Sequence, residues 1–128
     1  MDIDKMKSEL KMNNLFFPQC TIERKAVVES GEMNLNLKKE IKEIENGCFV
    51  VTLTLSISKD QELNVKVVAE ATFSMDNEDK EFVRNIMNNN TVAIMFPFIR
   101  SQVSLLTTQP GMAPIIVPPI NIEKFVEE

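Results

Sequence analysis

The stretch EIENGCFVVTLTLSIS, residues 43–58, decides the fold of this 128-residue chain. Apolar side chains occupy every second position from Phe49 to Ile57, and Thr and Ser occupy most positions between them. This period of two is typical of a strand with one buried face. The Asn46-Gly47 dipeptide just before it favours the positive φ angles of a two-residue hairpin turn. The stretch therefore predicts the turn and second strand of a β-hairpin.

The segments on both sides of this stretch show the same alternation. Within residues 33–41 the Met, Leu and Ile side chains all occupy odd-numbered positions, and the even-numbered positions carry charged or amide side chains. Residues 63–75 follow a turn near Asp60 and again carry apolar side chains at every second position. Three successive strands joined by short turns predict an antiparallel meander.

A fourth strand is expected upstream, within residues 15–28, where the pattern is also extended. Pro18 lies in this segment and lacks the amide hydrogen that a central strand donates, so we expect an edge position or a bulge. Residues 1–12 are polar and weakly periodic, and they are read as a flexible arm.

Helical periodicity begins near Asp76, which is expected to cap a helix. The Asn residues 88–90 are expected to interrupt it, and a second helix is predicted from about residue 91 to residue 107, with a kink or a late start at Pro97. That second helix is apolar on nearly every side. Because one sheet covers only one side of a helix, something else must cover the rest, and a second subunit is the simplest candidate.

Residues 112–120 form an uncharged, apolar segment with three prolines, which favour extended backbone. Such a loop must be buried or serve as a contact surface. Asn121 is expected to cap a last short helix over residues 122–128. The expected fold is α+β and a single domain over residues 1–128: a four-stranded antiparallel sheet, made of a meander plus an edge strand, with a long helix and a short C-terminal helix packed on one face.

Composition argues against several classes of function. The chain has no His, which removes His-based catalysis and His-containing metal sites, and its three Gly residues form no phosphate-binding loop. Its net charge of -5 opposes binding to nucleic acid. We therefore expect no enzyme activity, no cofactor and no metal. The apolar runs are too short to cross a bilayer, and the N-terminal residues resemble no secretory signal, so a cytoplasmic protein without membrane insertion is expected.

Three motifs resemble the SecB protein-export chaperone family. They are AIMFPFIR at residues 93–100, LLTT at residues 105–108 and PIIVPPIN at residues 114–121. In that family a helix with a similar motif leads into a proline-rich loop and a final helix. The resemblance covers about residues 10–128. It implies a dimer of dimers, with the long helices sandwiched between sheets, and the SecA translocase motor as a partner.

The resemblance implies an ATP-independent holdase that binds unfolded polypeptides, above all preproteins for export, in an apolar groove. The apolar residues expected to supply or support client contacts are Phe16, Phe17, Phe96, Phe98, Ile115, Ile116, Val117 and Ile120. The acidic residues expected to dock a basic partner from the solvent-exposed strand face are Glu32, Glu40, Glu43 and Glu70. The alternative is a SecB-like adaptor, or a chaperone associated with a toxin-antitoxin system, that holds one dedicated protein partner.

Overall fold

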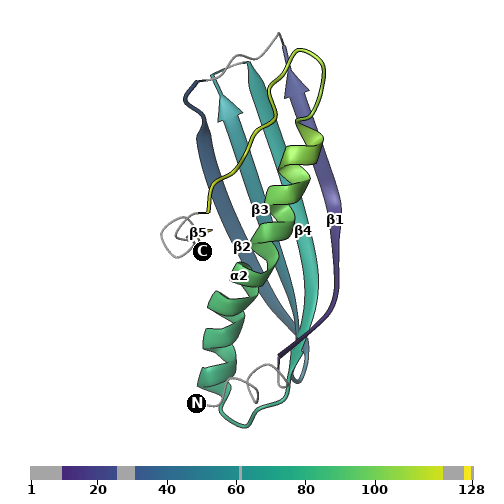
Figure 1. Cartoon of the computed structure of the whole chain (residues 1–128). Coiled ribbons are helices and arrows are strands. Elements are labelled where there is room, and N and C mark those ends of the chain that lie inside the picture. Colours follow the sequence, from purple (N-terminus) through teal and green to yellow (C-terminus); the bar gives the residue numbers. More distant parts are fainter. Residues whose placement is uncertain (1–9, 26–30, 61, 120–125, 128) are drawn as a thin grey trace.

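The computed structural model describes residues 10–25, 31–60, 62–119 and 126–127. The strands are β1 (Leu10–Arg24), β2 (Asn34–Glu45), β3 (Cys48–Lys59), β4 (Leu63–Met75) and the two-residue β5 (Val126–Glu127), and the helix is α2 (Lys80–Leu106). The sheet order is β1-β4-β3-β2-β5, and α2 lies along one face of the sheet (Figure 1). The predicted α+β fold, with its antiparallel meander and an added edge strand, is confirmed.

The alternation of side chains creates the two faces of the sheet. In β3 and β4 the odd-numbered residues are almost all buried on the side of α2, and register pairs such as Leu53 with Ala69 place them in common rows. The even-numbered residues of β3, including Thr52 and Thr54, face the opposite side and are only partly buried. We call these the helix side and the outer face. The core therefore lies between the sheet and α2.

The predicted hairpin turn joins β2 to β3 at Asn46-Gly47. Gly47 has a φ of 78°, in the left-handed region, and its carbonyl oxygen accepts a hydrogen bond of 2.8 Å from the Met75 amide. A Cβ atom on Gly47 would lie 2.9 Å from the Met75 carbonyl oxygen. Backbone conformation and lack of space both require glycine at this turn.

Strand β1 confirms the interpretation of Pro18. Among the residues that the structure describes it pairs only with β4, so it is an edge strand, and its register shifts between Phe16 and Gln19, around the proline. The strand begins earlier than expected, at Leu10, so residues 10–12 are paired rather than part of an arm. Residues 1–9 lie outside the described residues.

The helix differs from the expectation, because a single helix spans Lys80–Leu106. Its N-cap is Asp79 rather than Asp76, and the Asp79 carboxylate accepts a hydrogen bond of 3.1 Å from the Phe82 amide. The expected break at the Asn run is wrong, since the amide groups of Asn88 and Asn89 donate to helix carbonyls one turn earlier. Pro97 lies inside the helix and does not start it.

The C-terminal part follows the prediction in one respect and departs from it in another. Residues 112–119, which we call the strap, are extended and run beside α2 across the helix side (Figure 1). Val126 and Glu127 form β5, parallel to β2 at Leu37 and Lys38, so the predicted C-terminal helix does not include these two residues. The rest of that prediction, residues 121–125 and 128, lies outside the described residues.

The turn geometry generates a stability prediction. Gly47→Ala should lower the free energy of unfolding by about 1 to 3 kcal/mol, because alanine is strained at positive φ and its Cβ meets the Met75 carbonyl. Urea unfolding followed by circular dichroism measures this change. Gly31→Ala is the matched control: its Cβ would meet only the flexible end of Lys59 at 3.3 Å. An equal loss in both variants would contradict the special role of Gly47.

Candidate functional site

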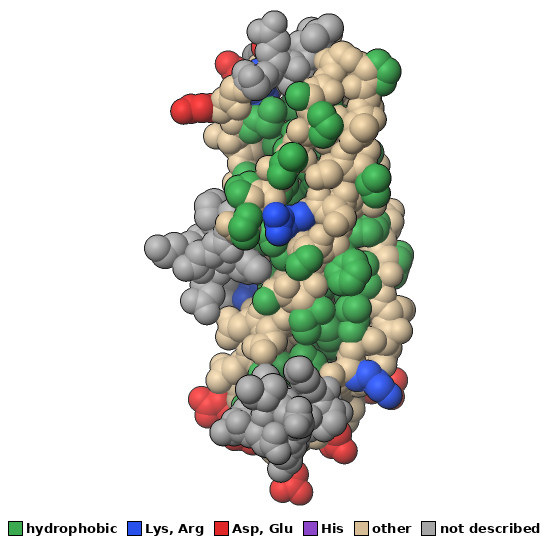
Figure 2. Space-filling model, in the orientation of Figure 1, with side chains coloured by type: hydrophobic (Ala, Val, Ile, Leu, Met, Phe, Trp, Pro, Cys, Tyr) green, Lys and Arg blue, Asp and Glu red, His purple; other side chains and the backbone are tan. Residues whose placement is uncertain are grey.

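The helix side exposes large apolar side chains. Ile94, Phe98 and Leu105 are 38%, 46% and 71% exposed, and their spacing places them on one side of α2, away from the sheet. We call this the outer stripe of α2. Ile116 of the strap is 76% exposed on the same side of the molecule. Figure 2 shows hydrophobic side chains scattered along this face between polar atoms. An apolar surface of this kind is typical of a contact site.

Hydrogen bonds from α2 hold the strap. Arg100 donates from Nε to the Val117 carbonyl at 2.7 Å, and Ser104 donates from Oγ to the Ile115 carbonyl at 3.2 Å. The Ile115 amide donates to the Thr107 hydroxyl oxygen at 2.8 Å. Val117 is only 2% exposed, whereas Ile116 beside it points to solvent. Over residues 115–118 the side chains of the strap thus alternate between core and solvent.

The proposed client-binding residues fall into three environments. Phe98 and Ile116 are exposed on the helix side, and Phe16 is 47% exposed on the outer face, in register with Glu70. Phe17 and Ile115 are partly buried against the core. Phe96 and Val117 are buried, so in this conformation they support the surface without forming it. Ile120 lies outside the described residues.

The proposed acidic residues do not share one face. Glu40 and Glu70 flank Thr52 in a row across the outer face, and Glu32 is exposed just before β2. Glu43 instead turns to the helix side, where its Oε2 accepts a hydrogen bond of 3.4 Å from the Gly47 amide.

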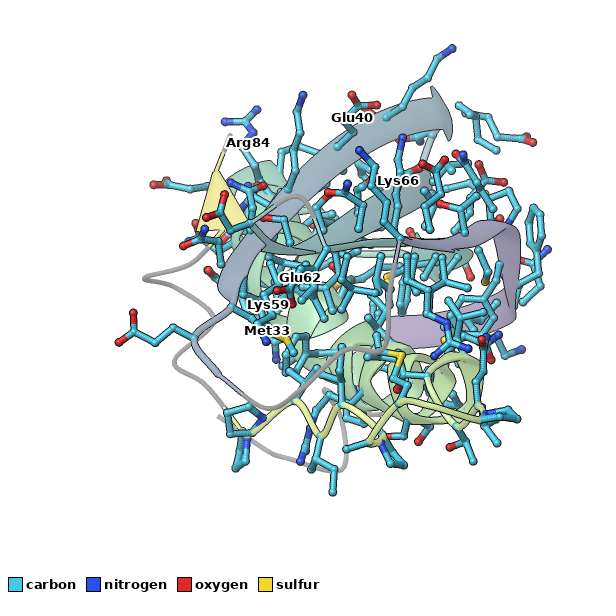
Figure 3. The ribbon with its side chains drawn as sticks, turned by 90° about the horizontal axis from the view of Figure 1, so that it is seen from above. Met33, Glu40, Lys59, Glu62, Lys66 and Arg84 are labelled. Carbon is cyan, nitrogen blue, oxygen red and sulfur yellow. The ribbon has the colours of Figure 1, made fainter. Side chains whose placement is uncertain are left out.

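The outer face carries both signs of charge, so it is not a uniformly acidic surface. Lys38 and Lys42 lie on the same side of β2 as Glu40. Figure 3 shows Glu40 and Lys66 both projecting away from α2 and the strap. Alternating charges of both signs on one strand face are typical of a solvated surface.

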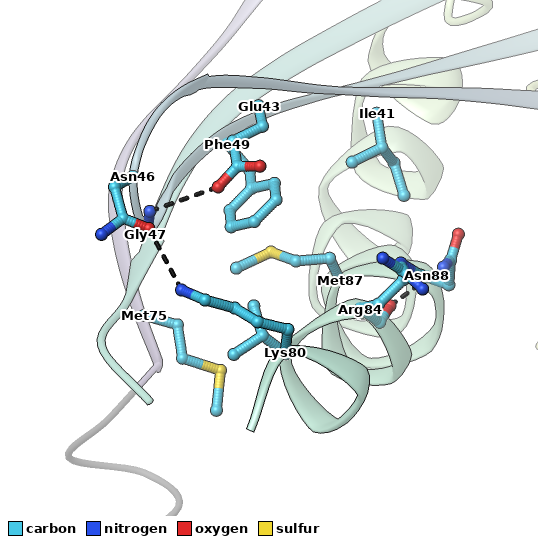
Figure 4. A pocket seen from close by; sticks show the side chains of 11 residues that line it. Ile41, Glu43, Asn46, Gly47, Phe49, Met75, Lys80, Arg84, Met87 and Asn88 are labelled. Carbon is cyan, nitrogen blue, oxygen red and sulfur yellow. Dashed lines mark hydrogen bonds between the residues drawn. The ribbon is translucent and has the colours of Figure 1, made fainter. Parts of the chain in front are cut away.

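A cavity of about 470 Å³ lies between the β2–β3 turn and the first turns of α2. Its apolar lining includes Phe49, Met75 and Met87, and Lys80 and Arg84 stand at its margin (Figure 4). Lys80 donates from Nζ to the Asn46 side-chain oxygen at 3.1 Å and bridges the turn to the helix. The walls of the cavity therefore combine apolar side chains with charged and amide groups, including Glu43 and Asn88.

Sequence reasoning missed this cavity because its walls come from β2, β3, β4 and α2, whose contacts no local pattern reveals. The only local signal is the spacing of Lys80 and Arg84, which places two cations one turn apart on α2. In the described part of the chain, no helix is long and apolar enough to cross a membrane.

Comparison with known proteins agrees with this architecture. The sequence model of the family described as preprotein translocase subunit SecB matches residues 9–128. The protein-export protein SecB of Aromatoleum aromaticum is 29% identical over 104 residues, which are 77% of this chain and 65% of that protein. This chain thus spans slightly less than two thirds of that relative's length. An uncharacterized protein of Methanocaldococcus jannaschii is 28% identical over 126 residues, 91% of this chain and 81% of that protein.

A solved structure shows the same fold at low sequence identity. The SecB-like chaperone Rv1957 of Mycobacterium tuberculosis, in complex with a peptide from the HigA1 antitoxin, matches with a TM-score of 0.73 and 12% identity. The match covers 91% of this chain and 95% of that chain. With the family match over nearly the whole sequence, the resemblance of the helix and strap motifs is confirmed, and the chain belongs to the SecB family.

Proposed function

We propose that this protein is a chaperone of the holdase type, which binds unfolded polypeptides in the cytoplasm without ATP and without chemical turnover. Preproteins for export are the proposed clients. The observation that carries the proposal is the exposure of Phe98 and Ile116 on the helix side of a chain that belongs to the SecB family. A surface of separate apolar side chains suits non-native chains, which expose such groups along their length.

The energetics favour broad rather than selective binding. Burying one exposed Phe or Ile contributes roughly 1.5 to 3 kcal/mol, so a few shallow contacts give useful affinity without a fixed client sequence. Phe16, Phe98 and Ile116 are the exposed members of the proposed client-binding set, and Phe17 and Ile115 border it. The buried Phe96 and Val117 support this surface from below. The net charge of -5 favours basic clients over acidic ones.

Self-association belongs to the same proposal. The outer stripe of α2 is too apolar to remain fully in water, and β1 has one edge without a strand partner in the described chain. A second copy covers both features if β1 meets β1 and α2 packs on α2. We therefore propose a dimer of dimers in which Ile94 and Leu105 lie in the contact between copies, whereas Phe98 and Ile116 stay open to clients.

We also propose a docking role for the acidic residues that face solvent, which lie on the outer face of the sheet and just before β2. Glu32, Glu40 and Glu70 are available to a basic patch of a hand-over partner, which we propose is the SecA translocase motor. Glu43 does not belong to this surface, since it faces the helix side.

The second candidate is an adaptor with one dedicated protein partner. It is favoured by the fold match to a SecB-like chaperone that was solved with an antitoxin peptide. The two candidates differ in client range: a holdase protects unrelated unfolded proteins, whereas an adaptor protects one partner alone.

A refolding assay tests the proposed function. A slow-folding secretory protein, unfolded in guanidinium and diluted into buffer with this chain, should stay unfolded without ATP. A second, unrelated client should behave in the same way, because the contacts are apolar and not specific in sequence. Normal refolding of both clients would contradict the holdase and favour the dedicated adaptor.

Single substitutions test the proposed client surface. Phe98→Ser and Ile116→Ser should each weaken binding of an unfolded client roughly tenfold, because each removes an exposed apolar contact. Isothermal titration with a permanently unfolded client measures the dissociation constant. Ile44→Ser is the matched control, since Ile44 is 50% exposed but lies in β2 near the hairpin turn, away from the strap. Equal affinities in all three variants would remove Phe98 and Ile116 from the client surface.

A further inference from the structure

We propose that the strap occupies a peptide-binding site on α2 and that an extended client segment takes its place. The site is the row formed by Arg100, Ser104 and Thr107, together with the buried position that Val117 fills. This inference rests on the proposed chaperone function and adds how the client is recognised. The protein binds main-chain atoms of its client, and in the absence of a client its own strap fills the site.

The row contacts only main-chain atoms of the strap. Arg100 binds the Val117 carbonyl, Ser104 binds the Ile115 carbonyl, and Thr107 accepts from the Ile115 amide. Main-chain groups of this kind exist in every extended polypeptide, whatever its sequence. Arg100 and Ser104 belong to α2 and Thr107 is its C-cap, so the backbone positions of the row are set by the helix and not by the strap. Recognition of this kind suits a protein that must bind many clients.

The apolar half of the site has the period of an extended chain. Val117 is 2% exposed and joins the core, Ile115 is partly buried, and Ile116 between them is 76% exposed. An extended client presents alternate side chains in the same manner, so an aliphatic residue can enter the position of Val117. The combination of main-chain hydrogen bonds and pockets for alternate side chains is a known mode of peptide recognition.

The attachment of the strap is weak enough to exchange. Within the described chain, no main-chain hydrogen bond ties residues 113–119 to a strand or to α2. Pro114, Pro118 and Pro119 lack an amide hydrogen and cannot add one. The segment is therefore held by three side-chain hydrogen bonds, by the burial of Met112 and Val117, and by the partial burial of Ile115. A tethered occupant competes at high effective concentration, but an unfolded client with several apolar segments offers several simultaneous contacts.

Two neighbouring strap residues, one buried and one exposed, provide a matched test of this exchange. Val117→Ser removes the buried anchor of the strap while leaving the row on α2 intact, and it should strengthen client binding about fivefold. Ile116→Ser changes an exposed strap side chain and leaves the anchor in place, so it should not strengthen binding. Isothermal titration with the same unfolded client gives both constants. Circular dichroism checks folding, and Val117→Ala replaces Val117→Ser if the serine variant does not fold. Weaker binding in both strap variants would make the strap a fixed wall and overturn the inference.

A second measurement is independent of general client binding. A labelled synthetic peptide with the sequence of residues 111–119 should bind the full-length Val117→Ser variant at least fivefold tighter than the unaltered chain, as measured by fluorescence polarisation. Ser104→Ala added to that variant should reduce this binding, because one main-chain contact is lost. Equal binding to the variant and the unaltered chain overturns the inference while the holdase stands. If the peptide binds tightly but the refolding of client proteins is not arrested, the holdase proposal is contradicted and the strap site on α2 still stands.

Discussion

One constraint shapes the whole molecule: a single helix must cover one face of a four-stranded sheet while being apolar on nearly all of its own sides. Met95, Ile99 and Val103 of α2 are completely buried toward the sheet. A flank of the helix beside this buried side then presents Phe98 and Leu105 to the surroundings. The strap completes the cover beside the helix, and its alternation gives one buried and one exposed aliphatic side chain. The architecture thus leaves apolar side chains exposed, and a chaperone binds unfolded polypeptides through such side chains.

The strands were predictable because burial on one face imposes a period of two, which the sequence displays directly. The helix was only partly predictable. Intrinsic propensity favours a break at residues 88–90, but the Asn side chains bond back to their own helix, and the burial of Met87, Thr91 and Val92 continues across the run. Tertiary packing outweighed local preference there. The N-cap moved from Asp76 to Asp79 because both residues have the same chemistry and only the path of the chain after β4 selects between them.

Candidate site residues were predictable by type but not by orientation. Phe96 and Phe98 have the same chemistry, yet helix geometry buries the first and exposes the second. The bulge around Pro18 helps to set the side of the sheet on which Phe16 lies, and the register irregularity between Glu43 and Glu45 marks the end of regular pairing near Glu43. The hydrogen bonds from Arg100, Ser104 and Thr107 to the strap had no local signal, because they join residues that only the return of the chain after α2 brings together.

The most direct measurement is the mass of the unaltered chain in solution, by sedimentation velocity at micromolar concentration. If Ile94 and Leu105 of the outer stripe and the open edge of β1 are covered by further copies, the mass should be four times the 14.6 kDa of one chain. A stable species with the mass of one chain and native circular dichroism would contradict this account. Ile94 and Leu105 would then remain in water without a partner, and apolar exposure would not drive assembly.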